Sequence, residues 1–139
     1  MPEASPRHLS VTALITRLGQ LFMEDRLSEA TRFWSFPCPV EVEGELMVMR
    51  DACALEAFFR RRRELARERG VLSIEPRVIA VEVPRDGRCR AWFRWVRHYA
   101  DRVEEDEQTS VYYMVRKPSG EFTIEMMDIV RTAAEAKSA

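Results

Sequence analysis

An acidic side chain near the end of the chain, Asp128, has a setting in which it could perform acid–base chemistry. It follows Phe122, Ile124 and Met126 at steps of two, so a strand would turn all four side chains to one face. A carboxyl group among apolar side chains holds its proton to higher pH and can act as a general acid or base. The alternative places Asp128 at a strand end, in water or paired with an arginine. Both interpretations remain open.

Two further polar candidates, Arg97 and Tyr99, lie on another expected strand. They follow Phe93 and Trp95 at steps of two, which predicts one face with an aromatic part and a polar rim. Arg97 could pair with Asp128 or hold a carboxylate ligand through two parallel hydrogen bonds. It could equally be an arginine that reaches water across apolar surface. The candidate catalytic set is therefore Asp128, Arg97 and Tyr99.

The opposite face of that strand carries Trp92, Arg94 and Val96. A large aromatic and an aliphatic side chain on an outward face suggest a surface covered by a second subunit. We expect a homodimer through this face.

A last group of side chains is expected to contact a ligand. Tyr113 shares a face with Val111 and Val115, so we expect it in the core or the pocket, its hydroxyl seeking a partner. The candidate ligand-binding residues are Phe93, Trp95, Tyr113, Met126 and Trp34.

Composition excludes several other functions. A net charge of −1 gives no general attraction to nucleic acid. The run Arg60 to Arg63 spreads around a helix and meets glutamates at helical spacing, so we expect a solvated surface. No segment approaches the roughly 20 apolar residues of a membrane span, and the presence of only two histidines argues against a metal site. We expect no cofactor, and three cysteines that read as buried, reduced thiols in the cytoplasm.

The elements that must position these side chains follow a lopsided order. Apolar residues at steps of three and four predict helices at about 9–22 and 27–34, the first capped by Ser10. A hairpin follows at 40–49, then a helix capped by Asp51 and ended by Gly70. Four strands complete the chain, at about 74–83, 89–99, 109–116 and 122–130, with a polar connection at 101–107. Residues 1–8 and 132–139 read as loose tails of one domain spanning 1–139.

This order indicates an α+β fold: a curved antiparallel sheet, made of the hairpin and a four-stranded meander, wrapped around three N-terminal helices. Together with the aromatic stretch 33–36, Gly44 in the hairpin, Asp51 and the segment 92–95, it resembles the nuclear transport factor 2-like superfamily, which includes SnoaL-like cyclases and ketosteroid isomerase. The resemblance implies a cone-shaped domain with a pocket between sheet and helices, and frequent dimerisation. The catalytic positions of ketosteroid isomerase fall near Leu18, Val42 and Tyr112, and neither Leu18 nor Val42 can serve.

The function that we expect is binding of a small apolar or carboxylate-bearing molecule in this pocket. The alternative is a SnoaL-like enzyme, an isomerase, cyclase, dehydratase or hydrolase, with Asp128 as general acid or base. No nucleic-acid or membrane partner is expected.

Overall fold

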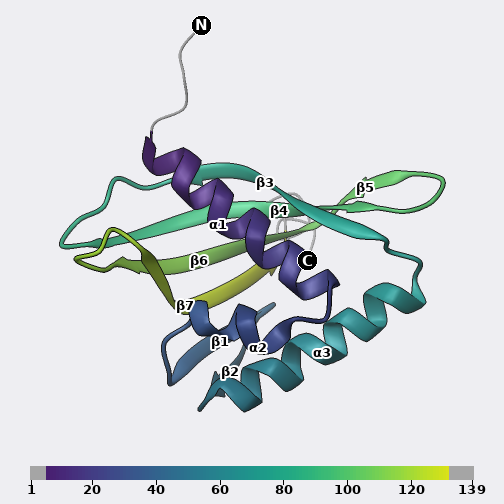
Figure 1. The fold of residues 1–139 in the computed structure, drawn as a ribbon, viewed down its shortest axis with the longest axis horizontal. Helices are drawn as coiled ribbons and strands as arrows, with labels where there is room; N and C mark the ends of the chain where they lie inside the picture. The colour runs from purple at the N-terminus through teal and green to yellow at the C-terminus, as the bar shows by residue number, and fades with distance from the viewer. Residues whose placement is uncertain (1–5, 132–139) are drawn as a thin grey trace, which may run out of the picture.

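Three helices and a 3-10 turn cover one side of a seven-stranded sheet in the computed structural model, which describes residues 6–131. The helical elements are α1 (Pro6–Met23), α2 (Leu27–Ala30), η1 (Thr31–Phe33) and α3 (Ala52–Glu68). The strands are β1 (Cys38–Val42), β2 (Glu45–Met49), β3 (Ser73–Val81), β4 (Arg88–His98), β5 (Val103–Glu105), β6 (Gln108–Arg116) and β7 (Phe122–Arg131). The expected α+β class is confirmed, with α1 crossing the sheet and α3 beside the β1–β2 hairpin (Figure 1).

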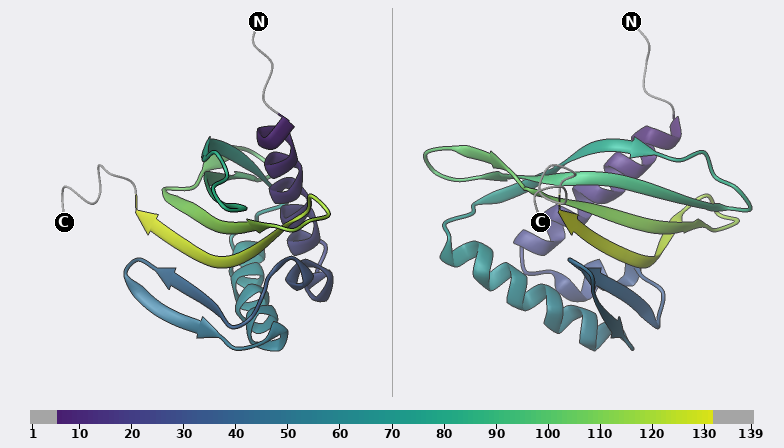
Figure 2. Two further views of the ribbon diagram at one scale, coloured as in Figure 1. Left: turned by 90° about the vertical axis from the view of Figure 1, so that its left-hand side faces the viewer. Right: turned by 180° about the vertical axis from the view of Figure 1, so that it is seen from behind.

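The sheet order is β2-β1-β7-β6-β4-β3, with β5 paired to β4. One pairing departs from the antiparallel arrangement that we expected. β1 runs parallel to β7, with Val40 opposite Met127, so the sheet is mixed. The alternation of side chains along a strand shows which face is buried, but it does not show whether the neighbouring strand runs parallel or antiparallel. The sequence pattern therefore could not predict this pairing. The sheet curves around the helices, as Figure 2 shows from the side.

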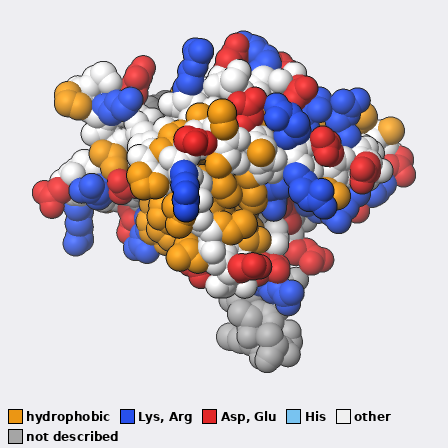
Figure 3. Space-filling view, turned by 90° about the horizontal axis from the view of Figure 1, so that it is seen from below, with side chains coloured by type: hydrophobic (Ala, Val, Ile, Leu, Met, Phe, Trp, Pro, Cys, Tyr) orange, Lys and Arg blue, Asp and Glu red, His pale blue; other side chains and the backbone are white. Residues whose placement is uncertain are grey.

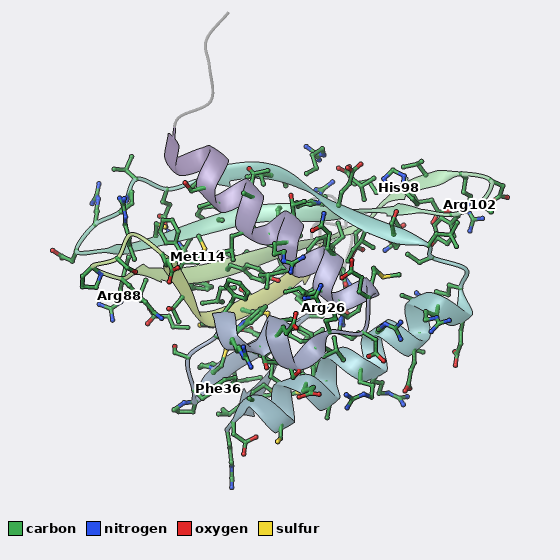
Figure 4. All side chains as sticks on the ribbon, viewed as in Figure 1. Arg26, Phe36, Arg88, His98, Arg102 and Met114 are labelled. Atoms are coloured by element: carbon green, nitrogen blue, oxygen red, sulfur yellow. The ribbon has the colours of Figure 1, made fainter. Side chains whose placement is uncertain are left out.

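The core lies between the concave face of the sheet and the helices. α1 contributes the stripe that its spacing predicts, Val11, Ile15, Leu18 and Leu21, all buried. Charged side chains lie at both ends of the sheet, where Arg88 and Arg102 are found, whereas Met114 is buried between them (Figure 4). We call the convex side of the sheet, which faces away from the helices, the outer face.

A close approach of α1 to the sheet depends on Gly19. A Cβ atom at this position would lie 3.0 Å from the Trp95 ring and 3.3 Å from Cγ1 of Ile74. Any larger residue would therefore press against β3 and β4.

The helix ends agree with the sequence in α3 and not in α1. Asp51 accepts a hydrogen bond of 2.9 Å from the amide of Ala54, and Gly70 has a positive φ of 88° just beyond the helix. The Ser10 cap is wrong, because α1 begins at Pro6, and proline suits a first turn in which amides lack partners. Residues 6–8 of the expected first tail thus belong to α1; residues 1–5 and the expected tail 132–139 lie outside the described part.

The acidic connection at 101–107 is also different from the expected loop. Its middle forms β5, whose residues Val103 to Glu105 pair with Val96 to His98 of β4. The resulting hairpin extends beyond the rest of the sheet (Figure 1).

An irregularity in β7 decides which of its side chains face the helices. Tyr113 lies opposite Met126 and Met114 opposite Ile124, so Glu125 has no partner across the pair. One extra residue in a strand is a β-bulge, and it reverses the alternation beyond it. Ile124 therefore faces the core on one side of the bulge, and Met127 and Ile129 face it on the other.

None of the helices within residues 6–131 has the length and apolar character needed to cross a membrane.

Candidate functional site

A cavity of about 320 Å³ lies between the concave face of the sheet and the three helices. Its wall is mostly apolar. The larger lining side chains are Leu18, Phe22, Trp34, Phe58, Phe59, Leu65, Ile74, Trp95, Tyr112, Met127 and Ile129. This volume is near the lower end of the range for small-molecule sites, about 300–1,000 Å³.

Aromatic rings form a connected wall of the cavity. Trp34 packs edge-on against Phe59 and Tyr112, at centroid distances of 5.2 and 5.8 Å. Phe93 lies behind this wall and contacts the rings of Tyr112 at 4.8 Å and Trp95 at 5.0 Å. Rings that pack edge to face in this way hold one another in place, which gives the wall a defined shape.

The polar part of the cavity lies where β4 meets the start of β6. Nη1 of Arg97 is 3.4 Å from Oδ1 of Asp106, and its Nη2 is 3.9 Å from Glu104. The same Asp106 oxygen accepts a hydrogen bond of 3.1 Å from the amide of Gln108. Asp106 is thus already bound on two sides.

A second arginine, Arg62 of α3, also lines the cavity. Its guanidinium lies over the ring of Phe58, 5.5 Å from the centroid. Burial lowers the pKa of Arg62, and the nearby charge of Asp106 offsets this only in part. Within residues 6–131, no carboxylate lies within 4.0 Å of the Arg62 guanidinium.

Three donors in the cavity region are available to a ligand acceptor. Burial raises the pKa of Tyr112, so its hydroxyl keeps its proton throughout the physiological range. Nε1 of Trp34 and Nε of Arg97 are buried, and neither has a hydrogen-bond partner within residues 6–131.

The structure brings together only some of the residues predicted for the site. Trp34, Trp95 and Arg97 line the cavity, and Phe93 supports it from behind. Tyr99 does not line it; it lies in the β4–β5 connection, with the Arg102 guanidinium 3.9 Å from its ring centroid.

Three other predicted placements need correction: Asp128, Met126 and Tyr113 are absent from the cavity lining and belong to the outer face. For Asp128 and Met126 the reason is the bulge at Glu125. After Ile124 it exchanges which side chains of β7 point to the helices and which point outward.

Tyr113 lies outside the cavity for a simpler reason. On β6 it is Ser110 and Tyr112 that line the cavity, and alternation then sends Tyr113 outward. There, the Arg90 guanidinium lies 6.0 Å from its ring centroid.

Asp128 keeps one expected property in this unexpected place. Burial and the neighbouring charge of Glu41 raise its pKa, and its Oδ1 is buried without a hydrogen-bond partner among the described residues. Glu41 lies directly across the β1–β7 pair. The expected pairing of Arg97 with Asp128 is replaced by the contacts of Arg97 with Asp106 and Glu104.

Sequence reasoning missed Arg62 and Asp106, and it named Tyr112 only through the resemblance to ketosteroid isomerase. The signal for Arg62 was available, since it stands seven residues after the buried Leu55 and four after Phe58, on the apolar stripe of its helix. No local signal marked Asp106, whose position depends on the β5 hairpin.

The cysteines fall into two kinds. Cys38 and Cys89 are buried, and burial raises the pKa of Cys38 to about 11, so its thiol is a poor nucleophile at neutral pH. Cys53 is exposed at the start of α3, which corrects the expectation that all three are buried.

The described residues include no group of His, Cys, Asp and Glu side chains that could hold a metal ion.

A family model described as "NTF2-like protein (DUF6841)" matches residues 10–132. The chain belongs to this NTF2-like family. The resemblance that the order of elements suggested is therefore confirmed.

Solved structures share the NTF2-like fold at low sequence identity. Aln2 from a Streptomyces species has a TM-score of 0.71 and 17% identity, covering 99% of this chain and 100% of Aln2. An NTF2-like protein with a cystatin-like fold from Novosphingobium aromaticivorans has a TM-score of 0.65 and 14% identity, over 94% of this chain and 86% of that protein. A Catenulispora acidiphila protein in complex with S-DNPA has a TM-score of 0.68 and 11% identity, over 96% and 98%. No curated protein sequence matches the chain.

Proposed function

We propose that this NTF2-like protein binds a small, mainly apolar molecule between its sheet and its helices. The observation that carries the proposal is the cavity of about 320 Å³, walled by aromatic rings and edged with a few polar groups. Apolar walls supply affinity in such sites, and a small number of polar groups orient the ligand. The complex of the Catenulispora acidiphila relative with S-DNPA lends support, since that protein has the same fold.

Fluorescence tests this proposal directly, because Trp34 and Trp95 line the cavity. A neutral aromatic probe, 2-acetylnaphthalene, should quench tryptophan emission saturably, with one probe per chain. Replacing Ala66 by phenylalanine places a bulky ring at the cavity and should weaken binding. Ala57→Phe is the matched control, because Ala57 is on the same helix, exposed and outside the lining. Absence of saturable quenching, or equal binding by both variants, would contradict the proposal.

The alternative of a SnoaL-like enzyme with Asp128 as general acid or base draws no support from the cavity. A catalytic group has to reach the reacting atoms, and Asp128 is absent from the lining.

We also propose that a second copy of the chain covers the outer face. Alternation places Trp92, Arg94 and Val96 of β4 there, with Val111 of β6 between them and β7. On the β4 part, Arg90 already pairs with Glu82 at 2.8 Å and Arg94 with Glu105 at 3.7 Å. Burial of the apolar side chains, and not charge, would therefore hold the two copies together across a two-fold axis.

Exposed apolar residues extend this face to the sheet edge. Leu46 and Val48 of β2 are 62% and 53% exposed. Hydrophobic side chains gather on the side seen from below, where α3 and the β1–β2 hairpin lie (Figure 3).

Light scattering tests the assembly. We expect the mass of a dimer, and the mass of a monomer after Trp92→Glu or Val96→Glu. Val83→Glu is the control, since Val83 is equally apolar and 66% exposed but lies in the β3–β4 connection. A monomeric parent protein would refute the proposal.

A reducing compartment, such as the cytoplasm, fits the three free cysteines.

A further inference from the structure

We infer that Arg62 is the anion-binding residue of the cavity, and that the ligand carries a carboxylate that lies against it. This inference rests on the proposed binding function and names the chemical class of its ligand. It assigns the anion to α3, whereas the sequence had suggested Arg97 of β4.

The charges of the lining favour an anion. Arg62, Arg69 and Arg97 line the cavity, and Asp106 is the acid among the described lining residues. Asp106 is occupied by Arg97 at 3.4 Å and by the amide of Gln108 at 3.1 Å. Arg97 has a second carboxylate in Glu104, at 3.9 Å. The charge of Arg97 is therefore neutralised by carboxylates of the protein, while its buried Nε, which has no partner among the described residues, remains a donor for a neutral ligand acceptor.

Arg62 is the arginine of this group that combines burial with the absence of an acid. Its guanidinium lies over the ring of Phe58, and the residue forms part of the cavity lining. Burial lowers its pKa, which means that the charged form has lost water that the surrounding protein replaces only in part. A bound carboxylate would replace that lost solvation with two parallel hydrogen bonds, the geometry that a guanidinium favours. Its neighbours on the chain have other roles: Arg60 pairs with Glu56 at 3.0 Å, and Arg63 donates to the carbonyl of Met23 at 3.1 Å.

The remainder of the lining limits what can be attached to the carboxylate. The rings of Phe58, Trp34 and Tyr112 line the same cavity as Arg62, and Phe58 lies directly against its guanidinium. An apolar, flat body with a single acidic group satisfies both parts of the site. A highly charged molecule would leave further charges facing aromatic carbon, at a large desolvation cost.

The test compares two probes that differ only in charge, 2-naphthoate and 2-naphthamide, at pH 7 and low salt. We measure dissociation constants by tryptophan quenching for the unmodified protein and for Arg62→Met. Arg61→Met is the matched control, because it removes the same charge from an exposed neighbouring position of α3. Arg62→Gln repeats the measurement should Arg62→Met fail to fold by circular dichroism.

The unmodified protein should bind naphthoate about tenfold or more tightly than naphthamide, since a hydrogen bond to a charged group contributes about 1.5–3 kcal/mol. Arg62→Met should abolish this preference and leave naphthamide binding intact, and Arg61→Met should retain the preference. Equal binding of both probes by the unmodified protein would overturn the inference and leave the proposed function standing. A preference that survives Arg62→Met would overturn it as well, by assigning the anion to Arg97 or Arg69. Failure of both probes to bind would overturn the proposed function itself.

Discussion

Gly19 controls how closely α1 approaches the wall of the cavity, and replacing it by alanine tests that geometry. The new Cβ atom would lie 3.0 Å from Cζ3 of Trp95, 3.3 Å from Cγ1 of Ile74 and 3.4 Å from the Ile74 carbonyl oxygen. The carbonyl is backbone and cannot give way easily. The Trp95 ring is therefore the group that has to move.

Two opposing effects set the size of the change. In an unobstructed helix interior, Gly→Ala stabilises by about 1 kcal/mol. Crowding in a packed interior costs about 1–3 kcal/mol. We therefore expect Gly19→Ala to leave the free energy of unfolding unchanged or to lower it by up to about 2 kcal/mol. When Trp95 is first replaced by leucine, the contact at 3.0 Å disappears, and Gly19→Ala should then stabilise by about 0.5–1 kcal/mol.

The parent protein, Gly19→Ala, Trp95→Leu and the double variant form a double-mutant cycle. Urea unfolding, followed by far-ultraviolet circular dichroism, gives the free energy of unfolding of each. The expected coupling between the two sites is about 1–3 kcal/mol. Ala13→Gly supplies the reference, because Ala13 is exposed on the same helix and its substitution should cost about 1 kcal/mol with or without Trp95. Stabilisation of the parent protein by the full 1 kcal/mol or so on Gly19→Ala would refute the reasoning. Because Trp95 lines the cavity, the displaced ring should also weaken binding of 2-acetylnaphthalene.

Three further outcomes are expected. Because the folded state raises the pKa of Asp128, its ionised form opposes folding once the pH exceeds the unfolded value; Asp128→Asn should raise the free energy of unfolding at pH 7 by about 1 kcal/mol or less, and the gain should vanish in acid titrations. At pH 8 a thiol reagent should label Cys53 rapidly and spare Cys38, whose pKa is about 11; peptide mass spectrometry identifies the labelled residue, and equal rates would contradict the burial of Cys38. Asp51→Ala removes the cap bond to the Ala54 amide and should cost about 0.5–2 kcal/mol in thermal or urea unfolding, whereas Asp51→Ser should retain most of that stability.

Uninterrupted alternation along β4 explains why Trp95 and Arg97 share a face, whereas Tyr99, expected on the same face, lies beyond the end of the strand and outside the lining. Trp95 and Arg97 line the cavity as their spacing indicates, with Phe93 buried behind them. The same logic failed on β7, where the bulge at Glu125 exchanges the two faces. A bulge depends on how a strand meets its neighbour, so strict alternation along one strand gives no warning of it.

Arg62 shows a different limit. The four consecutive arginines are expected to spread around the helix and to be solvated, and this describes the exposed Arg60 and Arg61 well. Helical geometry turns each successive side chain by about 100°, so one member of the run lies on the apolar stripe. The charge of Arg62 predicts a solvated side chain, whereas its position on the helix predicts a place in the cavity wall. In the structure, Arg62 lines the cavity.

The parallel pairing of β1 with β7 has a consequence for the order in which the protein acquires its shape. Val40 meets Met127, so these partners are separated by most of the chain. A nascent polypeptide emerging at about 5–20 residues per second exposes the β1–β2 hairpin well before β7 exists. Until then, β1 has one free edge, and two β7 residues of the cavity wall, Met127 and Ile129, are missing. The cavity is thus completed by β7, the last of the described strands, and the ability to bind a ligand shows that this strand has joined the sheet.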